Sequence, residues 1–188
     1  MLPGCSTYTP CKVGQSIVSW TIYQGGNPDK VTFELTNLTS DYLAVLSQDT
    51  PFNLGNDGIL NGNTLVFGSP GSDPVQYRGR LVHYVGASAS SVLQLAPHAT
   101  ESVSVRISLN YSIRSHQAIH VGLAADHVFL MRFKESAQLR KWLKTISGAD
   151  DFRIVAACPI GTRGNRATVS KFPPTGDKGT TGDKGTDK

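Results

Sequence analysis

The amino-acid sequence predicts an all-β fold, in the form of an antiparallel β-sandwich with a short C-terminal helix and a disordered tail. Apolar and polar residues alternate at 31–36 and again at 103–109, which is typical of strands with one buried face. Glycine, serine and threonine are frequent, and the apolar segments are short and bounded by turn residues. After residue 133 the spacing of apolar residues changes to that of an amphipathic helix.

A chain of 188 residues has room for one domain of ordinary size that can stabilise its own core. Residues 1–14 are expected to form an N-terminal arm, and residues 15–172 the sandwich domain with a helix and strand extension. Residues 173–188 contain repeated Gly-Asp-Lys-Gly-Thr units that have no apolar side chain to bury. Because ordering would not repay its entropy, we expect this tail to be disordered.

The expected strands, in chain order, are 16–23, 31–36, 42–46, 64–67, 75–85, a strand that ends at Leu95, 103–109, 119–124 and 127–133. Segments 64–67 and 75–85 are predicted to pair with each other, with a bulge or a close backbone approach at Gly79. Val103, Val105, Ile107 and Leu109 are expected to point inward. Seven or more short strands separated by turns are the pattern of an immunoglobulin-like sandwich.

A helix is predicted at about 136–147, because Leu139, Trp142, Leu143 and Ile146 fall on one helical face. Ser136 is the expected N-cap, and Gly148 the expected stop. A strand at 152–158 follows, and 167–172 is a candidate for one more.

Three marks in the sandwich region resemble a known module. They are the turn at 50–53 (Thr-Pro-Phe-Asn), the bend at 77–79 (Tyr-Arg-Gly) and the segment at 95–103 (Leu-Ala-Pro-His-Ala-Thr-Glu-Ser-Val). Residues 16–133 are similar to the immunoglobulin-like pro-domain of deuterolysin-type and peptidyl-lysine zinc metallopeptidases, without the catalytic domain. The resemblance implies a non-catalytic protein-binding module, an inhibitor or folding partner of a metalloprotease. The helix, strand and tail depart from the family, since they stand where the enzyme would begin.

Binding is expected at the irregular segments of this region. The loop at 49–63 is rich in asparagine, glycine and aspartate, and it is longer than most connections in a compact domain, so it is either mobile or used for binding. The bend at 77–80 is the second irregular element. The residues predicted to contact a protein partner are Asn53, Asn56, Asp57, Tyr77, Arg78 and Arg80.

A structural or adhesive surface module, or a coat module, is the alternative, because positive charge is unevenly placed. Nine basic residues and three acids lie between Arg132 and Lys171, whereas the whole chain has a formal net charge of +4. Such a region would attach to an acidic polymer or a nucleic acid. Its predicted contacts are Arg140, Lys141, Lys144, Arg163 and Arg166. Nucleic acid is the weaker of these partners, since few aromatic residues lie nearby for base stacking.

No catalytic site, metal site or cofactor is predicted. His116 and His120 have the spacing of a zinc motif, but Gln117 stands where the general-base glutamate is needed. The alternation at 119–123 makes this segment a strand, which would hold the two imidazoles too far apart for one zinc ion. Cys158 is expected to be a buried structural thiol.

The compartment and the oligomeric state stay open. Asn37-Leu38-Thr39 and Asn110-Tyr111-Ser112 are glycosylation acceptor patterns that lean towards secretion, although such tripeptides arise often by chance. The pairing of the three cysteines, Cys5, Cys11 and Cys158, is undetermined. We find neither a signal-peptide pattern nor a membrane-spanning segment. The chain is expected to be secreted if a signal peptide has been removed, and cytoplasmic if the chain is complete.

Overall fold

The computed structural model describes residues 17–68, 75–83, 87–113, 119–125, 127–146, 156–159 and 166–169. The strands are β1 (Val18–Gln24), β2 (Lys30–Asn37), β3 (Tyr42–Leu46), β4 (Leu65–Gly68), β5 (Gln76–Tyr77), β6 (Val92–Leu95), β7 (Thr100–Arg106), β8 (Tyr111–Ser112), β9 (Ile119–Leu123), β10 (His127–Phe133), β11 (Ala156–Pro159) and β12 (Arg166–Val169). The helices are α1 (Ile107–Asn110) and α2 (Ser136–Leu143), with a 3-10 turn at Ala89–Ser91. All of the strand pairs are antiparallel within the described residues, which confirms the all-β prediction.

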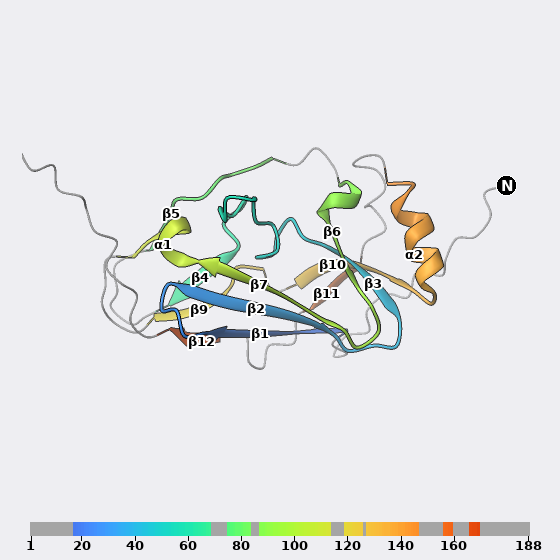
Figure 1. Cartoon of the computed structure of the whole chain (residues 1–188), viewed down its shortest axis with the longest axis horizontal. Coiled ribbons are helices and arrows are strands. Elements are labelled where there is room, and N and C mark those ends of the chain that lie inside the picture. The colour runs from blue at the N-terminus through green and yellow to red at the C-terminus, as the bar shows by residue number, and fades with distance from the viewer. Residues whose placement is uncertain are drawn as a thin grey trace, which may run out of the picture.

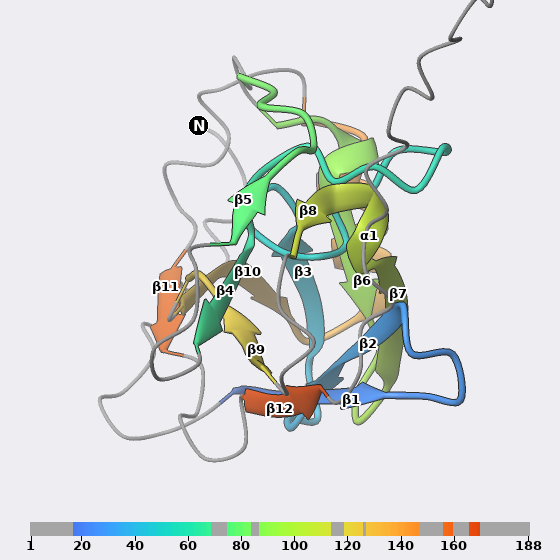
Figure 2. The ribbon, with the colours of Figure 1, turned by 90° about the vertical axis from the view of Figure 1, so that its left-hand side faces the viewer.

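Two sheets form the sandwich. One has the strand order β1-β2-β7 and the other the order β11-β10-β3-β6 (Figures 1 and 2). With the first three strands taken as A, B and C, these orders are A-B-E and G-F-C-C′, which is the arrangement of an immunoglobulin-type sandwich. The fold therefore agrees with the sequence-based prediction.

The core lies between the two sheets. On β2 the side chains of Val31, Phe33 and Leu35 are fully buried, whereas the residues between them are partly exposed, as the alternation predicts. Leu43 and Val45 of β3 belong to the same buried cluster. One continuous core thus joins the sheets.

Strands β4, β9 and β12 form a further sheet, in which β9 lies between the other two strands. Strand β10 likewise lies between β3 and β11. The eighteen residues between β3 and β4 form a loop, which contains the predicted binding loop. The side of β12 away from β9 lies beside β1 (Figures 1 and 2).

The predicted pairing of 64–67 with 75–85 is wrong. Strand β4 pairs with β9 instead, and within 75–83, the described part of the second segment, only Gln76–Tyr77 is a strand, paired with β8. A strand was predicted at the correct place for β4. The local sequence pattern, however, contains no information about which distant strand supplies the hydrogen bonds.

The inward-facing strand predicted at 103–109 ends early, at Arg106. Ile107 is buried as expected, but it begins the helical turn α1. Asp29, in the β1–β2 turn, stabilises this turn, because its carboxylate accepts hydrogen bonds from the Ser108 backbone N–H at 2.7 Å and the Ser108 hydroxyl at 2.6 Å. The strand therefore gives way to a helical turn because of Asp29, which lies about eighty positions earlier in the chain.

Helix α2 covers the outer edge of the β3–β10 region (Figure 1). Leu139 is buried, and the Trp142 ring lies 5.4 Å from the Phe133 ring, so this part of the apolar stripe packs as predicted. The helix ends at Leu143 and not at about 147, so Ile146, although buried, lies beyond it. Glu135, not Ser136, is the N-cap, and its side chain makes no capping hydrogen bond. Instead, the Gln138 side chain accepts a hydrogen bond from the Lys134 N–H at 3.2 Å.

Several sequence-based predictions lie outside the described residues. These are the N-terminal arm with Cys5 and Cys11, the tail at 173–188, and the positions of His116, Gly148 and Arg163. In the part of the chain that is described, no helix is long and apolar enough to cross a membrane.

Candidate functional site

The loop between β3 and β4 is packed against the sandwich rather than extended from it. Leu60 is fully buried, and Phe52 and Leu54 pack against the core. Leu54 and Leu60 form an isolated antiparallel bridge that closes the loop on itself. Asn53 donates from Nδ2 to the Gln48 carbonyl at 2.9 Å. The 49–63 loop therefore has a defined backbone position at one end of the sandwich.

Asn110 fixes the middle of the loop. It is fully buried at the end of α1. Its Oδ1 accepts a hydrogen bond from the Leu60 N–H at 2.7 Å, and its Nδ2 donates to the Gly58 carbonyl at 3.1 Å and the Arg106 carbonyl at 2.9 Å. One buried amide thus joins the loop to the end of β7.

Tyr77 joins the 77–80 bend to the same loop. Its ring lies 5.2 Å from the Tyr111 ring, and its hydroxyl oxygen lies 2.7 Å from the carbonyl oxygens of both Leu60 and Arg80. A Cβ at Gly79 would lie 2.3 Å from that hydroxyl oxygen, so the ring can fold over this position only because it is a glycine. Gly79 is therefore a point of close approach, as the sequence suggested.

An ion pair joins the outer surfaces of the loop and the bend. The guanidinium of Arg80 contacts the Asp57 carboxylate, and both side chains are largely exposed. The pKa of Asp57 lies below its ordinary value, because its carboxylate accepts a hydrogen bond from the Ile59 N–H and lies beside the Arg80 charge. An exposed pair of this kind contributes little to stability, so its effect is to orient the two side chains.

The structure brings all six predicted contact residues to one end of the sandwich, but they have different roles. Asn53 is buried and Tyr77 is half-buried, and both hold the loop in place. Asp57 and Arg80 pair with each other. Asn56 and Arg78 are exposed, and their side chains make no hydrogen bond or ion pair with any described residue. These two are the predicted residues that remain available to a partner.

Leu81 and Val82 were missed in the sequence. Their side chains are 73% and 42% exposed, directly after the bend. Both lie within 75–85, which was predicted to be a strand of the sandwich. The only available signal was Arg78-Gly-Arg80, which interrupts the alternation before them. We define the tip surface as Asn56, Arg78, Leu81 and Val82.

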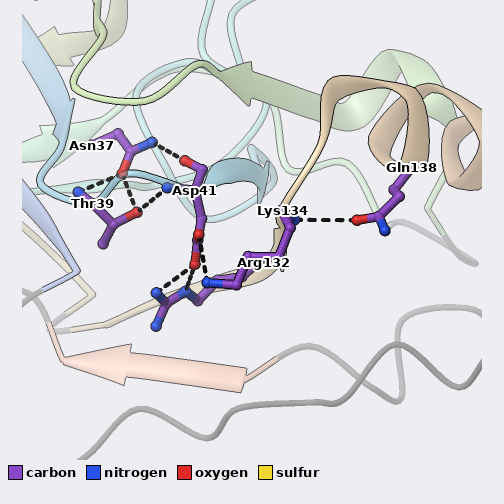
Figure 3. A network of polar contacts seen from close by, with 6 residues as sticks. All are labelled: Asn37, Thr39, Asp41, Arg132, Lys134 and Gln138. Atoms are coloured by element: carbon purple, nitrogen blue, oxygen red, sulfur yellow. Dashed lines mark hydrogen bonds and ion pairs between the residues drawn. The ribbon is translucent and has the colours of Figure 1, made fainter.

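A second polar cluster lies at the opposite end of β3 (Figure 3). The Asp41 side chain is only 4% exposed, and it accepts hydrogen bonds from Arg132 Nε at 2.9 Å and from Lys134 Nζ at 2.9 Å. Burial raises the pKa of Asp41, but the hydrogen bonds and charges of Lys134 and Arg132 outweigh it and hold the pKa below its ordinary value. The cluster joins β3 to the end of β10, just before α2.

Acid should remove the contribution of Asp41 to stability. A carboxyl group whose pKa is lowered by folding stabilises the protein above its unfolded pKa of about 3.9, and this stabilisation is lost as the pH falls through the folded pKa. We expect Asp41→Asn to lower the free energy of unfolding by about 2 kcal/mol at neutral pH, because a buried acceptor of charged donors is replaced. Urea unfolding of both proteins from pH 7 to pH 3 measures this. A difference that stays constant below pH 4 would show that the Asp41 charge is not responsible.

The predicted basic patch is only partly within the described residues. Arg140, Lys141 and Lys144 are exposed on α2, and none forms an ion pair with a described residue. Arg166 begins β12, but its side chain is outside the described part, and Arg163 is outside it entirely. The structure therefore supports a basic helix face and does not place the other two charges on it.

Both glycosylation acceptor asparagines are buried. Asn37 is fully buried and donates from Nδ2 to the carbonyls of Asp41 at 2.7 Å and Ala96 at 2.8 Å (Figure 3 shows the first). Asn110 uses its Nδ2 in the same way, in the bonds to Gly58 and Arg106. Because a glycan attaches at Nδ2, neither position of the folded chain can carry one. The two glycosylation tripeptides are therefore no evidence for secretion.

No protein-family model and no curated protein matches the chain. Among the residues that the structure describes, no group of three or more histidine, cysteine, aspartate or glutamate side chains is placed to hold a metal ion. Of the two histidines considered as a zinc motif, His120 lies on strand β9 as predicted.

Proposed function

We propose that this protein is a non-catalytic protein-binding module and that it binds its partner through the tip surface. The observation that carries the proposal is the exposure of Leu81 and Val82 on a segment whose backbone is fixed to the loop. Arginine is enriched at the centres of protein interfaces, and the exposed aliphatic side chains beside Arg78 would bury apolar area when a partner binds.

The rigidity of this end favours binding. Leu60, Asn61 and Asn110 hold the 78–82 backbone through hydrogen bonds of 2.8 to 3.1 Å. Little conformational entropy remains to be lost when a partner docks, so more of the contact energy appears as affinity. Loops on a fixed sandwich bind partners in this way in other proteins.

The partner class that we propose is a metalloprotease. This choice depends on the resemblance of residues 16–133 to deuterolysin-type pro-domains, in which an immunoglobulin-like module assists folding of the enzyme and inhibits it. The tip surface supports the choice of a metalloprotease, because the exposed end of a sandwich can enter an active-site cleft.

A binding assay with matched variants tests the proposal. Leu81→Ser combined with Val82→Ser should weaken binding to a deuterolysin-type catalytic domain by at least tenfold, since each residue would lose about 1 kcal/mol or more of apolar contact. Leu38→Ser is the control, because Leu38 is 46% exposed on a different turn. If the control loses binding, or if the double variant keeps it, the tip surface is not the binding site. If the wild type does not bind the enzyme, the partner class is wrong.

Attachment to an acidic polymer or nucleic acid through α2 is the second candidate. Three unpaired cations on two turns of helix support it, but Trp142 packs on Phe133 and is not free for base stacking. Arg140→Glu, Lys141→Glu and Lys144→Glu together should abolish binding to heparin and to single-stranded DNA, and binding by the wild type should fall steeply with salt. Equal retention of the triple variant and the wild type on heparin would refute this candidate.

A further inference from the structure

We propose that the 78–83 segment binds its partner by β-strand addition, with an extended acidic segment of another polypeptide pairing along its free edge. The inference depends on the proposed function, since it specifies how the tip surface would bind a protein.

The evidence is a period of two in the backbone hydrogen bonds. The N–H of Arg78 donates to the Asn110 carbonyl at 2.8 Å, that of Arg80 to the Leu60 carbonyl at 2.9 Å, and that of Val82 to the Asn61 carbonyl at 3.1 Å. Every second residue therefore donates toward the body of the protein. The chain bends at Gly79, and beyond this bend the alternate donors Arg80 and Val82 have the pattern of an extended chain paired along one side only.

The intervening residues face the other way. In an extended chain, the N–H and C=O groups of Leu81 and His83 point to the side opposite those of Arg80 and Val82, and Gly79 lies at the bend before them. Their backbone groups form no hydrogen bond with any residue in the described ranges. Leu81 and His83 are both exposed, so this edge lies in water. An open edge of this kind is a template for another strand.

The charges indicate what kind of strand would pair there. Arg78 and Arg80 both lie on the segment, and only Arg80 has an acidic neighbour among the described residues, Asp57. Aliphatic side chains flank the edge at Leu81 and Val82. A complementary strand would therefore alternate acidic residues with apolar or β-branched residues. A second copy of this chain would bring its own two arginines to the same edge, which disfavours self-pairing.

Amide exchange in the free protein provides the first test. The amides of Arg78, Arg80 and Val82 should be protected, and those of Gly79, Leu81 and His83 should exchange rapidly. Protection of all six amides without a ligand would refute the free edge.

The second test uses synthetic peptides of about ten residues, the usual length range of a strand. One set alternates aspartate with valine and threonine, and a matched set has lysine in place of aspartate. We expect the acidic set to bind at least tenfold more tightly and to protect Gly79, Leu81 and His83 in the complex. Methylation of alternate peptide nitrogens should abolish binding, because it removes the ladder hydrogen bonds. If the lysine set binds equally, or if the three amides stay unprotected in the complex, the proposal is wrong.

Two substitutions at one position separate backbone from side-chain recognition. Leu81→Pro removes an outward donor and none of the inward bonds, and an extended Arg80 is compatible with a following proline. Leu81→Thr also removes the leucine side chain but keeps the donor. We expect the proline variant to bind the acidic peptide at least tenfold more weakly than the threonine variant. Val82→Pro is the matched control for folding, since it removes an inward bond and should lower stability where Leu81→Pro does not.

The outcomes distinguish this inference from the proposed function. Equal peptide binding by Leu81→Pro and Leu81→Thr would refute strand addition, even if the serine double variant still loses its protein partner. If the serine double variant still binds the partner, the tip surface itself is refuted as the binding site.

A dimer that forms in the wild type and is lost in Leu81→Pro would show that the edge pairs with a second copy, and the proposal of an acidic partner would then be wrong. If Leu81→Pro does not fold, the methylated peptides and the exchange pattern still decide.

Discussion

Replacing Asn110 with alanine is expected to lower the free energy of unfolding by about 4 kcal/mol, one of the largest effects of any polar substitution in this protein. The change leaves the N–H of Leu60 and the carbonyl of Gly58 without their partner inside the protein, and it removes the side-chain bond to the Arg106 carbonyl. Buried backbone groups that lose a hydrogen bond each cost about 1 to 3 kcal/mol, although relaxation of the loop would recover part of the sum. Urea unfolding followed by tryptophan fluorescence measures the loss.

Asn56→Ala is the control for this experiment. Asn56 lies in the same loop, is exposed and makes no side-chain hydrogen bond with a described residue. Its replacement should change stability by less than about 0.5 kcal/mol. If Asn110→Ala is as stable as the control, the buried amide does not fix the loop, and the rigid tip surface loses its physical basis.

Asn37→Ala should be comparably destabilising, by about 3 to 4 kcal/mol. Its Nδ2 donates to two carbonyls, and its Oδ1 accepts from the Thr39 N–H at 2.9 Å and the Thr39 hydroxyl at 2.8 Å. Three of these bonds lie at the turn that leads from β2 into β3, and the fourth reaches Ala96 between β6 and β7, so their loss affects both sheets. Thermal unfolding by circular dichroism is sufficient to detect a change of this size.

The chain contains a closely matched control at Asn27. Its Oδ1 accepts a hydrogen bond from the N–H two residues later, Asp29, at 2.9 Å, as the Asn37 Oδ1 does from Thr39. Asn27 is exposed, however, and its Nδ2 makes no hydrogen bond with a described residue. We expect Asn27→Ala to cost less than about 1 kcal/mol. Similar losses for the two variants would mean that local turn geometry, and not burial, determines the stability at Asn37.

Local patterns predicted the strands well but not their partners. The alternation at β2 and the apolar run of β3 were found because a buried face repeats every two residues, whatever the strand pairs with. The partner of β4 was wrong, because it depends on how a long loop returns to the sheet. The helical turn at Ile107 was missed because its stabilising group, Asp29, is distant in sequence.

The candidate site could be located from the sequence but not resolved into roles. Length and composition indicated the 49–63 loop, and a glycine within a predicted strand indicated the irregular segment at 77–80. Nothing in the sequence separates Asn53, which holds the loop, from Asn56, which faces water. Asn37 and Asn110 were considered only as glycosylation acceptors, because a buried asparagine is recognisable only from partners that the sequence does not place near it.

The contacts that fix the loop are made largely to its backbone. Asn110 bonds to the Leu60 N–H and the Gly58 carbonyl, and Tyr77, Arg80 and Val82 approach the carbonyls of Leu60 and Asn61. Every residue type except proline has both of these groups, so the exposed side chains can be exchanged without changing the path of the chain. Closure entropy also rises only slowly with loop length. The loop between β3 and β4 is therefore a suitable place to insert new recognition sequences. They could be inserted at the turn around Asn56 while the strands of the sandwich keep their register.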